Sequence, residues 1–299
     1  MSEDFPVRFR RGEAIANEPD GTYLDRALHQ ALQEDLFSVH YQPKVNSDGV
    51  FAGFEALLRL THPELGDLPP DLFIPVAEAS GLIVPIGSWA LDEVCRQIAE
   101  WSARGFGEIL VAVNVSSVQV TRPDFAEQVR ECLERRNVSP ANVELELTES
   151  QALRGADEAR VQMKALRAIG VRFSIDDFGV GYSSLSYLHR LQVDAIKLDR
   201  SFVQSIDTDD GARRLVKAMI GVAQALELNI VAEGVETEEQ RAAVVAAGCP
   251  YMQGFYFSRP QPASWFDGLL AARNSSGNDL RRLCAAVVLE PLSLQTGGA

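Results

Sequence analysis

Residues 171–177 read Val171-Arg172-Phe173-Ser174-Ile175-Asp176-Asp177, a short apolar run typical of a β-strand that ends in two carboxylates. Six further strand-like runs carry a polar side chain within them or just past their end. Together the runs supply eight candidate site residues: Glu55, Asn114, Glu146, Asp176, Asp177, Lys197, Glu233 and Gln253. Helix-like segments separate the runs, so the sequence predicts an α/β barrel whose strand ends converge on one pocket. Five of the eight side chains are carboxylates, and such a pocket would repel itself unless a hard cation filled it.

The composition permits one large domain and limits the partners it could have. The chain has 299 residues, 46% of them hydrophobic, which suffices for a sizeable core. The near-even alternation of strand and helix favours a single barrel over two domains. A formal net charge of −14 argues against polymeric nucleic acid and anionic membranes, since both require a basic surface. A small phosphorylated ligand is not excluded, because bound divalent ions reverse the local charge.

The sequence contains no recognisable targeting or membrane-spanning segment. Residues 1–11 carry charges and lack an apolar stretch, and no run approaches the roughly 20 apolar residues of a membrane span. The four cysteines are scattered without a Cys-x-x-Cys pair, which is typical of reduced thiols. We therefore expect a cytoplasmic protein.

The order of elements includes one departure from an all-parallel barrel. Phe37–Val45 alternates as a strand and meets the turn Asn46-Ser47-Asp48-Gly49. Asp-Gly between two strand-like runs indicates a hairpin, so this strand should run antiparallel to Val50–Leu60. Helices are expected at residues 23–34, 70–80, 86–104, 123–136 and 156–169. The predicted domain organisation is a linker or N-terminal tail at 1–22, a barrel at 23–273 and a C-terminal tail at 274–299.

Longer motifs surround the strand-end residues. Glu55-Ala56-Leu57 is followed by Leu58-Arg59. The other segments are Tyr41-Gln42-Pro43, Val113-Asn114-Val115-Ser116, Glu146-Leu147-Thr148-Glu149-Ser150, Asp176-Asp177-Phe178-Gly179, Lys197-Leu198-Asp199-Arg200-Ser201-Phe202-Val203, Val231-Ala232-Glu233-Gly234-Val235-Glu236-Thr237 and Gln253-Gly254. In this order they resemble the EAL family, bacterial phosphodiesterases of the second messenger cyclic di-GMP, over roughly 37–262. A lone Glu-Ala-Leu would carry no weight, whereas eight ordered motifs are very specific.

The resemblance implies a TIM-like (β/α)8 barrel with one antiparallel strand and a site for two Mg²⁺ or Mn²⁺ ions. Glu55, Asn114, Glu146 and Asp176 would hold one ion. Asp176 would also bridge to the second ion, whose ligands Asp177 and Glu233 complete. Oxygen ligands of this kind suit Mg²⁺. The implied reaction is divalent-metal-dependent hydrolysis of cyclic di-GMP to linear pGpG by a metal-activated water.

The resemblance also assigns roles around the metals. Lys197, with Glu55 and Glu233, belongs to the implied catalytic set, and Lys197 would act either as a base or by orienting the water. Gln42, Arg59 and Gln253 would bind the substrate, Arg59 through its planar guanidinium on a phosphate. Glu149 would anchor the loop after Asp177. Taken singly, a strand-end carboxylate more often serves the start of the next helix; the joint pattern argues for the metal set.

One position departs from the family pattern and leaves an alternative open. Val180 stands where the family's Asp-Phe-Gly-Thr-Gly loop has threonine, which affects loop regulation more than the metal ligands. The alternative is a catalytically weak cyclic di-GMP receptor that signals by conformational change. A third interpretation, an unrelated divalent-metal barrel enzyme, fits poorly with Asn114 and the Asp176-Asp177 pair. The resemblance further implies a homodimer.

Overall fold

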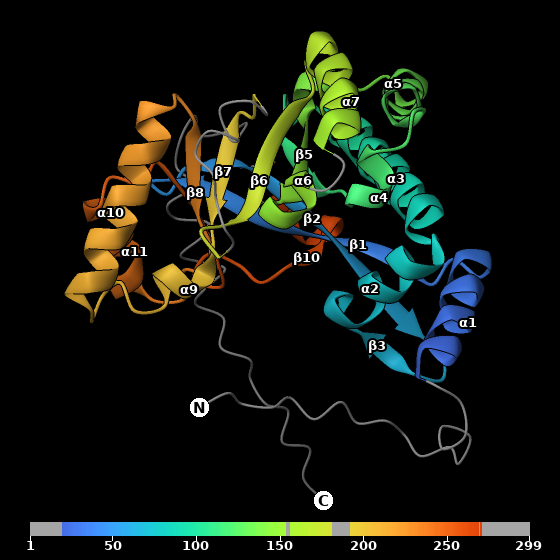
Figure 1. The fold of residues 1–299 in the computed structure, drawn as a ribbon, viewed down its shortest axis with the longest axis horizontal. Helices are drawn as coiled ribbons and strands as arrows, with labels where there is room; N and C mark the ends of the chain where they lie inside the picture. The colour runs from blue at the N-terminus through green and yellow to red at the C-terminus, as the bar shows by residue number, and fades with distance from the viewer. Residues whose placement is uncertain (1–19, 154–155, 181–191, 269, 271–299) are drawn as a thin grey trace, which may run out of the picture.

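The computed structural model describes residues 20–153, 156–180, 192–268 and 270 (Figure 1). The predicted C-terminal tail at 274–299 lies outside the described residues, as does most of the predicted N-terminal tail. Helix α1 (Asp20–Gln33) includes the last three residues that were assigned to that tail. None of the helices in the described ranges combines the length and the apolar character that crossing a bilayer requires.

Eight strands close into a barrel. Their bounds are β1 (Phe37–Asn46), β2 (Phe51–His62), β4 (Val111–Asn114), β5 (Val143–Thr148), β6 (Arg172–Phe178), β7 (Ala195–Leu198), β8 (Asn229–Ala232) and β9 (Tyr251–Gln253). From β2 to β9 each neighbouring pair is parallel, while β1 lies antiparallel to both β2 and β9 and closes the ring. Two short strands pair antiparallel with members of the barrel: β3 (Gly66–Leu68) with β2, and β10 (Gln261–Pro262) with β1. The predicted barrel with one antiparallel strand is confirmed.

Helices cover the outside of the barrel (Figure 1). They are α2 (Pro70–Ser80), α3 (Ile83–Ala103), α4 (Ser117–Val120), α5 (Phe125–Arg136), α6 (Glu149–Leu153), α7 (Ala156–Ile169), α9 (Arg200–Val203), α10 (Asp210–Ala225) and α11 (Glu238–Ala246), with 3-10 turns at Pro140–Asn142 and Ala263–Phe266. In Figure 1, α10 and α11 flank one side and α3, α5 and α7 the other. The predicted bounds agree within three residues, and α2 ends as predicted at Gly81, whose φ of 80° stops the helix.

Helices α1 and α2 and the outer part of β2 form an annex with an apolar core of its own. Leu28, Phe37, Leu60 and Phe73 are fully buried or nearly so within it. This annex stands beside the barrel end at which the parallel strands finish, so it forms one wall of the site described below.

The alternation of side chains along each strand separates the two faces of the barrel wall. In β5, Val143, Leu145 and Leu147 belong to the apolar core, whereas Glu144 and Glu146 contact lysines. Both glutamates are nevertheless buried, because they face the closed interior of the barrel instead of solvent. Because side chains alternate along β5, the polar residues of this strand all point into the barrel interior.

A β-bulge interrupts β6 at its carboxyl end. Ile175 pairs with Ile196 and Phe178 with Leu198, so β6 carries one more residue than β7 over this stretch. Asp177 takes up the difference with a left-handed φ of 54°. A bulge redirects side chains that would otherwise alternate strictly between the two faces of the strand.

Candidate metal centre and active site

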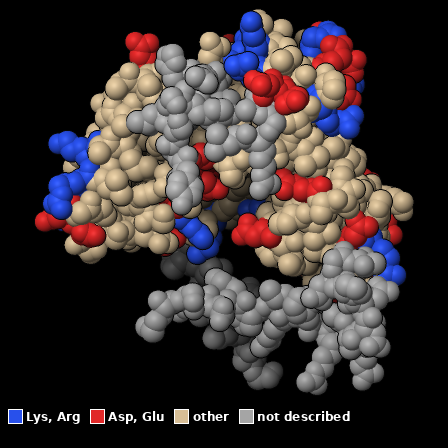
Figure 2. Space-filling view, viewed as in Figure 1, with Lys and Arg blue, Asp and Glu red and all other residues tan. Residues whose placement is uncertain are grey.

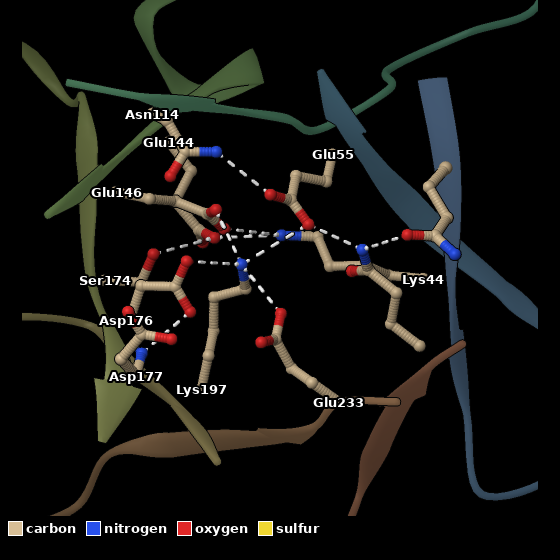
Figure 3. Close-up of polar contacts among 12 residues, drawn as sticks. Lys44, Glu55, Asn114, Glu144, Glu146, Ser174, Asp176, Asp177, Lys197 and Glu233 are labelled. Atoms are coloured by element: carbon tan, nitrogen blue, oxygen red, sulfur yellow. Dashed lines mark hydrogen bonds and ion pairs between the residues drawn. The ribbon is translucent and has the colours of Figure 1, made fainter. Parts of the chain in front are cut away.

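The side chains predicted from strand ends meet in the barrel interior, as Figure 3 shows. Asn114 and Gln253 are the last residues of β4 and β9, and Glu233 directly follows β8. Glu55, Glu146, Asp176 and Lys197 lie on β2, β5, β6 and β7. Because the carboxyl ends of parallel strands open at the same end of a barrel, these distant segments supply one pocket.

Three carboxylates form a compact donor group. One oxygen each of Glu55, Glu146 and Asp176 lies within 4.8 Å of the others. The Asn114 amide nitrogen donates a hydrogen bond of 2.9 Å to Glu55 Oε1, which turns the Asn114 amide oxygen away from Glu55 (Figure 3). Gln253 Nε2 donates to Glu55 Oε2 at 2.5 Å. Two amides thus fix the orientation of the Glu55 carboxylate.

Lys197 occupies the middle of the cluster. Its Nζ lies 2.8 Å from an oxygen of Glu146 and of Glu233, 3.2 Å from Asp176 and 3.3 Å from Glu55. Although burial by itself would lower it, the pKa of Lys197 is raised well above its ordinary value by the four carboxylates. In this arrangement the side chain is an ammonium ion and acts as the cation of the pocket.

One lysine does not satisfy the surrounding carboxylates. Burial raises the pKa of Glu146 to about 8, and repulsion from Glu55 adds to this against the attraction of Lys197. Burial likewise raises the pKa of Glu233 well above its ordinary value. Glu146 Oε1 is buried and has no hydrogen-bond partner. An excess of buried oxygen donors, one of which accepts no hydrogen bond, fits a hard divalent cation, so the residues present suit the implied metals.

Asp177 lies at the rim and not in the compact group. Its side chain is exposed, and its backbone N–H donates to Asp176 Oδ1 at 2.9 Å. The pKa of Asp177 is raised mainly by partial burial, and repulsion from Asp176 and Asp199 adds to the rise. Its role in a second metal position stays a prediction, and so does that of Glu233, whose carboxylate contacts Lys197.

Gln42 and Gln253 form a chain of amides behind Glu55. Gln253 Nε2 donates to Gln42 Oε1 at 3.0 Å, and Gln42 Nε2 donates to the Ser258 carbonyl at 3.0 Å. Both polar atoms of Gln42 are therefore used inside the protein, while Gln253 Oε1 is buried without a hydrogen-bond partner. This geometry places Gln42 as a support of Gln253, and its predicted contact with substrate stays a prediction.

Arg59 and Glu149 lie beside the centre on separate elements. Arg59 is four residues beyond Glu55 on β2 and so points to the same face of the strand; its Nη1 donates to the Leu58 carbonyl at 2.8 Å. Glu149 begins α6, and its Oε2 accepts a hydrogen bond of 3.3 Å from the backbone N–H of Gly179. Glu149 thus contacts the loop that follows Asp177, and the next residue, Val180, is 63% exposed.

A cavity of about 600 Å³ adjoins the carboxylates. Glu55, Asn114 and Asp176 line one side of it, and apolar side chains from β2, α2 and α3 line the other, among them Leu57, Ile74, Pro75 and Ile86. Figure 2 shows a hollow on this face with several acidic side chains and some basic ones beside it. The combination of an anionic, oxygen-rich end and an apolar wall suits a ligand with both phosphate and ring parts, provided that cations neutralise the anionic end.

Sequence reasoning missed a second group of charges beneath the first. Lys44 on β1 lies 2.9 Å from Glu144 Oε1, and Ser174 donates to the same oxygen at 3.2 Å. All three are buried. Their spacing was the available signal, because Lys44 and Glu144 stand two residues from Gln42 and Glu146 on their own strands and must share those residues' faces.

Comparisons with known proteins identify the relatives of this chain. The profile of the EAL domain matches residues 25–260. The bifunctional diguanylate cyclase/cyclic di-GMP phosphodiesterase MucR of Pseudomonas aeruginosa is 45% identical over 251 residues, which cover 83% of this chain and 36% of that protein. The cyclic di-GMP phosphodiesterase PdeR of Escherichia coli is 40% identical over 245 residues, covering 82% of this chain and 37% of PdeR.

A solved structure described as a complex of the PaMucR phosphodiesterase with c-di-GMP matches with a TM-score of 0.78 and 44% identity, covering 82% of this chain and 99% of that one. The chain spans about a third of the length of the curated relatives. The family profile covers most of the chain, and both curated relatives are at least 40% identical to it over more than four fifths of its length. The chain therefore belongs to the EAL domain family.

Proposed function

We propose that this chain is a divalent-cation-dependent phosphodiesterase that hydrolyses cyclic di-GMP to linear pGpG. The observation that carries the proposal is the group of Glu55, Glu146 and Asp176 oxygens around Lys197, next to a cavity with an apolar wall. Support comes from relatives named cyclic di-GMP phosphodiesterases and from the PaMucR complex.

The position of each residue suggests its role in the proposed reaction. Glu55, Asn114, Glu146 and Asp176 would hold one Mg²⁺ or Mn²⁺, and Asp176, Asp177 and Glu233 a second. When bound, the cations lower the pKa of a water and neutralise charge on the phosphoryl oxygens. Lys197 lies within reach of the same oxygens and would orient that water. Water adds to phosphorus, the bond from phosphorus to the ribose 3′ oxygen breaks, and the 3′ oxygen leaves with a proton.

Arg59 and Gln253 would hold the substrate. Arg59 offers a planar set of donors to a phosphate on the face of β2 that it shares with Glu55. Gln253 keeps one buried amide oxygen without a hydrogen-bond partner while its nitrogen fixes Glu55. The cavity between β2, α2 and α3 would take a guanine ring against its apolar wall.

The test is turnover of cyclic di-GMP with Mg²⁺, Mn²⁺ or Ca²⁺, with the products separated by chromatography. We expect linear pGpG with Mg²⁺ or Mn²⁺ and little with Ca²⁺, whose coordination is larger and looser. Glu55→Gln should lose activity by about 100-fold or more, since even outer partners of a metal site cost 10–100-fold. Glu131→Gln, an exposed position on α5, is the matched control. Absence of product at saturating metal contradicts the proposal.

The alternative is a receptor that binds cyclic di-GMP and signals by conformational change, which Val180 in the loop after the aspartates favours. Tight binding in the turnover assay without any product supports it, and hydrolysis at a useful rate excludes it. The homodimer, the cytoplasmic location and the domain organisation stay predictions from the sequence.

A further inference from the structure

A buried ion pair lies one layer deeper in the barrel than the proposed metal centre. Lys44 Nζ is 2.9 Å from Glu144 Oε1, and Ser174 Oγ donates to that same oxygen. The other mouth of the barrel contains a separate cavity of about 340 Å³, and Lys44 and Glu144 are among the residues that line it. The pair therefore stands between the two ends of the lumen.

The deeper layer touches the metal centre at one residue, Glu146. Its Oε2 lies 2.8 Å from Lys197 and its Oε1 lies 3.6 Å from Lys44. Each oxygen of this fully buried carboxylate thus faces a different ammonium group, and in Figure 3 the side chains of Lys44 and Lys197 both point toward it. If a cation takes over the contacts of Lys197, Lys44 is the ammonium group that still faces Oε1.

The charge of the deeper layer is already balanced. Glu144 neutralises Lys44 at hydrogen-bond distance, and both side chains are buried. The pair consequently adds little net charge to the region above it, in contrast to Lys197. Its influence on Glu146 is mainly one of orientation, the function that outer partners of metal ligands commonly have.

We propose that Lys44, held by Glu144, which itself accepts a hydrogen bond from Ser174, is a positioning residue that fixes the Glu146 carboxylate for cation binding. The inference rests on the proposed function, because it assumes that Glu146 is a ligand. It assigns no contact with substrate to Lys44, which lies below the ligands.

The experiment measures Mg²⁺ and Mn²⁺ binding to the metal-free protein by calorimetry. Lys44→Met alone leaves two buried carboxylates without their partner and threatens the fold. The double variant Lys44→Met with Glu144→Gln removes the pair together. We expect its metal dissociation constant to rise by about 10-fold or more, while urea unfolding shows that it remains folded. Ser174→Ala, which removes a single hydrogen bond to Glu144, should raise the constant by a smaller factor, about threefold, in line with the net contribution of one hydrogen bond.

The control is another ion pair, Arg167 and Asp194, whose Nη1 and Oδ2 lie 2.7 Å apart and which contacts none of the proposed ligands. Arg167→Met with Asp194→Asn should leave the metal dissociation constant unchanged. If the double Lys44–Glu144 variant and Ser174→Ala are both folded and both bind metal within twofold of the parent, this inference is overturned while the proposed function stands. Absence of any metal binding by the parent protein overturns the proposed function and this inference together.

Discussion

Replacing Lys197 with methionine removes the ammonium group that contacts all four central carboxylates. Its Nζ is within 3.3 Å of Glu55, Glu146, Asp176 and Glu233, and its side chain is 1% exposed. Methionine keeps most of the volume, so packing changes little. The charge that the ammonium balanced is then left in the interior, which is the costly part of breaking a buried pair.

Removal of one partner from a buried ion pair costs about 3–5 kcal/mol, and contact with four carboxylates places Lys197→Met toward the upper end. Urea unfolding should show this loss in the metal-free protein. Mg²⁺ at about 100 times its dissociation constant stabilises the folded state by about 2.7 kcal/mol. Because the cation no longer competes with an ammonium group, calorimetry should find tighter Mg²⁺ binding in the variant than in the parent. Mg²⁺ should therefore recover about half of the lost stability.

The control is Lys217→Met on the exposed face of α10, which should change neither stability nor metal affinity by more than about 0.5 kcal/mol. Two results refute the reasoning. One is a metal-free Lys197→Met protein as stable as the parent, which would mean that the carboxylates need no cation. The other is weaker Mg²⁺ binding in the variant, which would mean that Lys197 and metal do not compete.

Three further perturbations test other parts of the molecule. Arg59→Lys should raise KM for cyclic di-GMP by about tenfold through loss of paired donation to a phosphate, and an unchanged KM in steady-state kinetics refutes the assignment. Gly179→Ala should lower the unfolding free energy by about 1–3 kcal/mol, since φ is 98° and a Cβ would lie 2.4 Å from Met219 Cε; urea unfolding measures it. Hydrogen bonds from Arg136 and then Arg135 hold the pKa of Asp92 at about 2, against burial. A depressed pKa stabilises the fold above the unfolded value near 3.9, so the advantage of Asp92 over Asn, about 1 kcal/mol after solvent screening, should disappear between pH 4 and 2 in urea unfolding. A difference in unfolding free energy between the parent and Asp92→Asn that does not change with pH contradicts this account.

Local signals in the sequence were sufficient for the barrel and for most of the centre. Apolar runs set the strands, Asp48-Gly49 set the antiparallel β1, and residues at strand ends converge once parallel strands close. The deeper pair was missed because a charged residue within a strand, such as Glu144, is equally compatible with a solvent-facing side. Only closure of the barrel makes that side an interior.

Two other features could not be predicted from the hydrophobic periodicity of the sequence. Consecutive aspartates in a regular strand would point to opposite faces, and the bulge that places Asp177 at the rim beside Asp176 comes from the pairing of β6 with β7. The supporting role of Gln42 depends on the carbonyl of Ser258, which is 216 residues away in sequence. No local pattern in the chain encodes such a partner.

The antiparallel closure of β1 has a consequence for how the protein is made. Glu55 receives a hydrogen bond from Gln253, 198 residues later, and Gln253 in turn bonds Gln42, 211 residues away. Contacts of such long range form late and slowly during folding, because a large loop must be closed before they are gained. A nascent chain that has not yet emerged from the ribosome as far as β9 can neither seal the barrel nor orient Glu55. The proposed hydrolysis would thus begin only after almost the whole barrel has been synthesised.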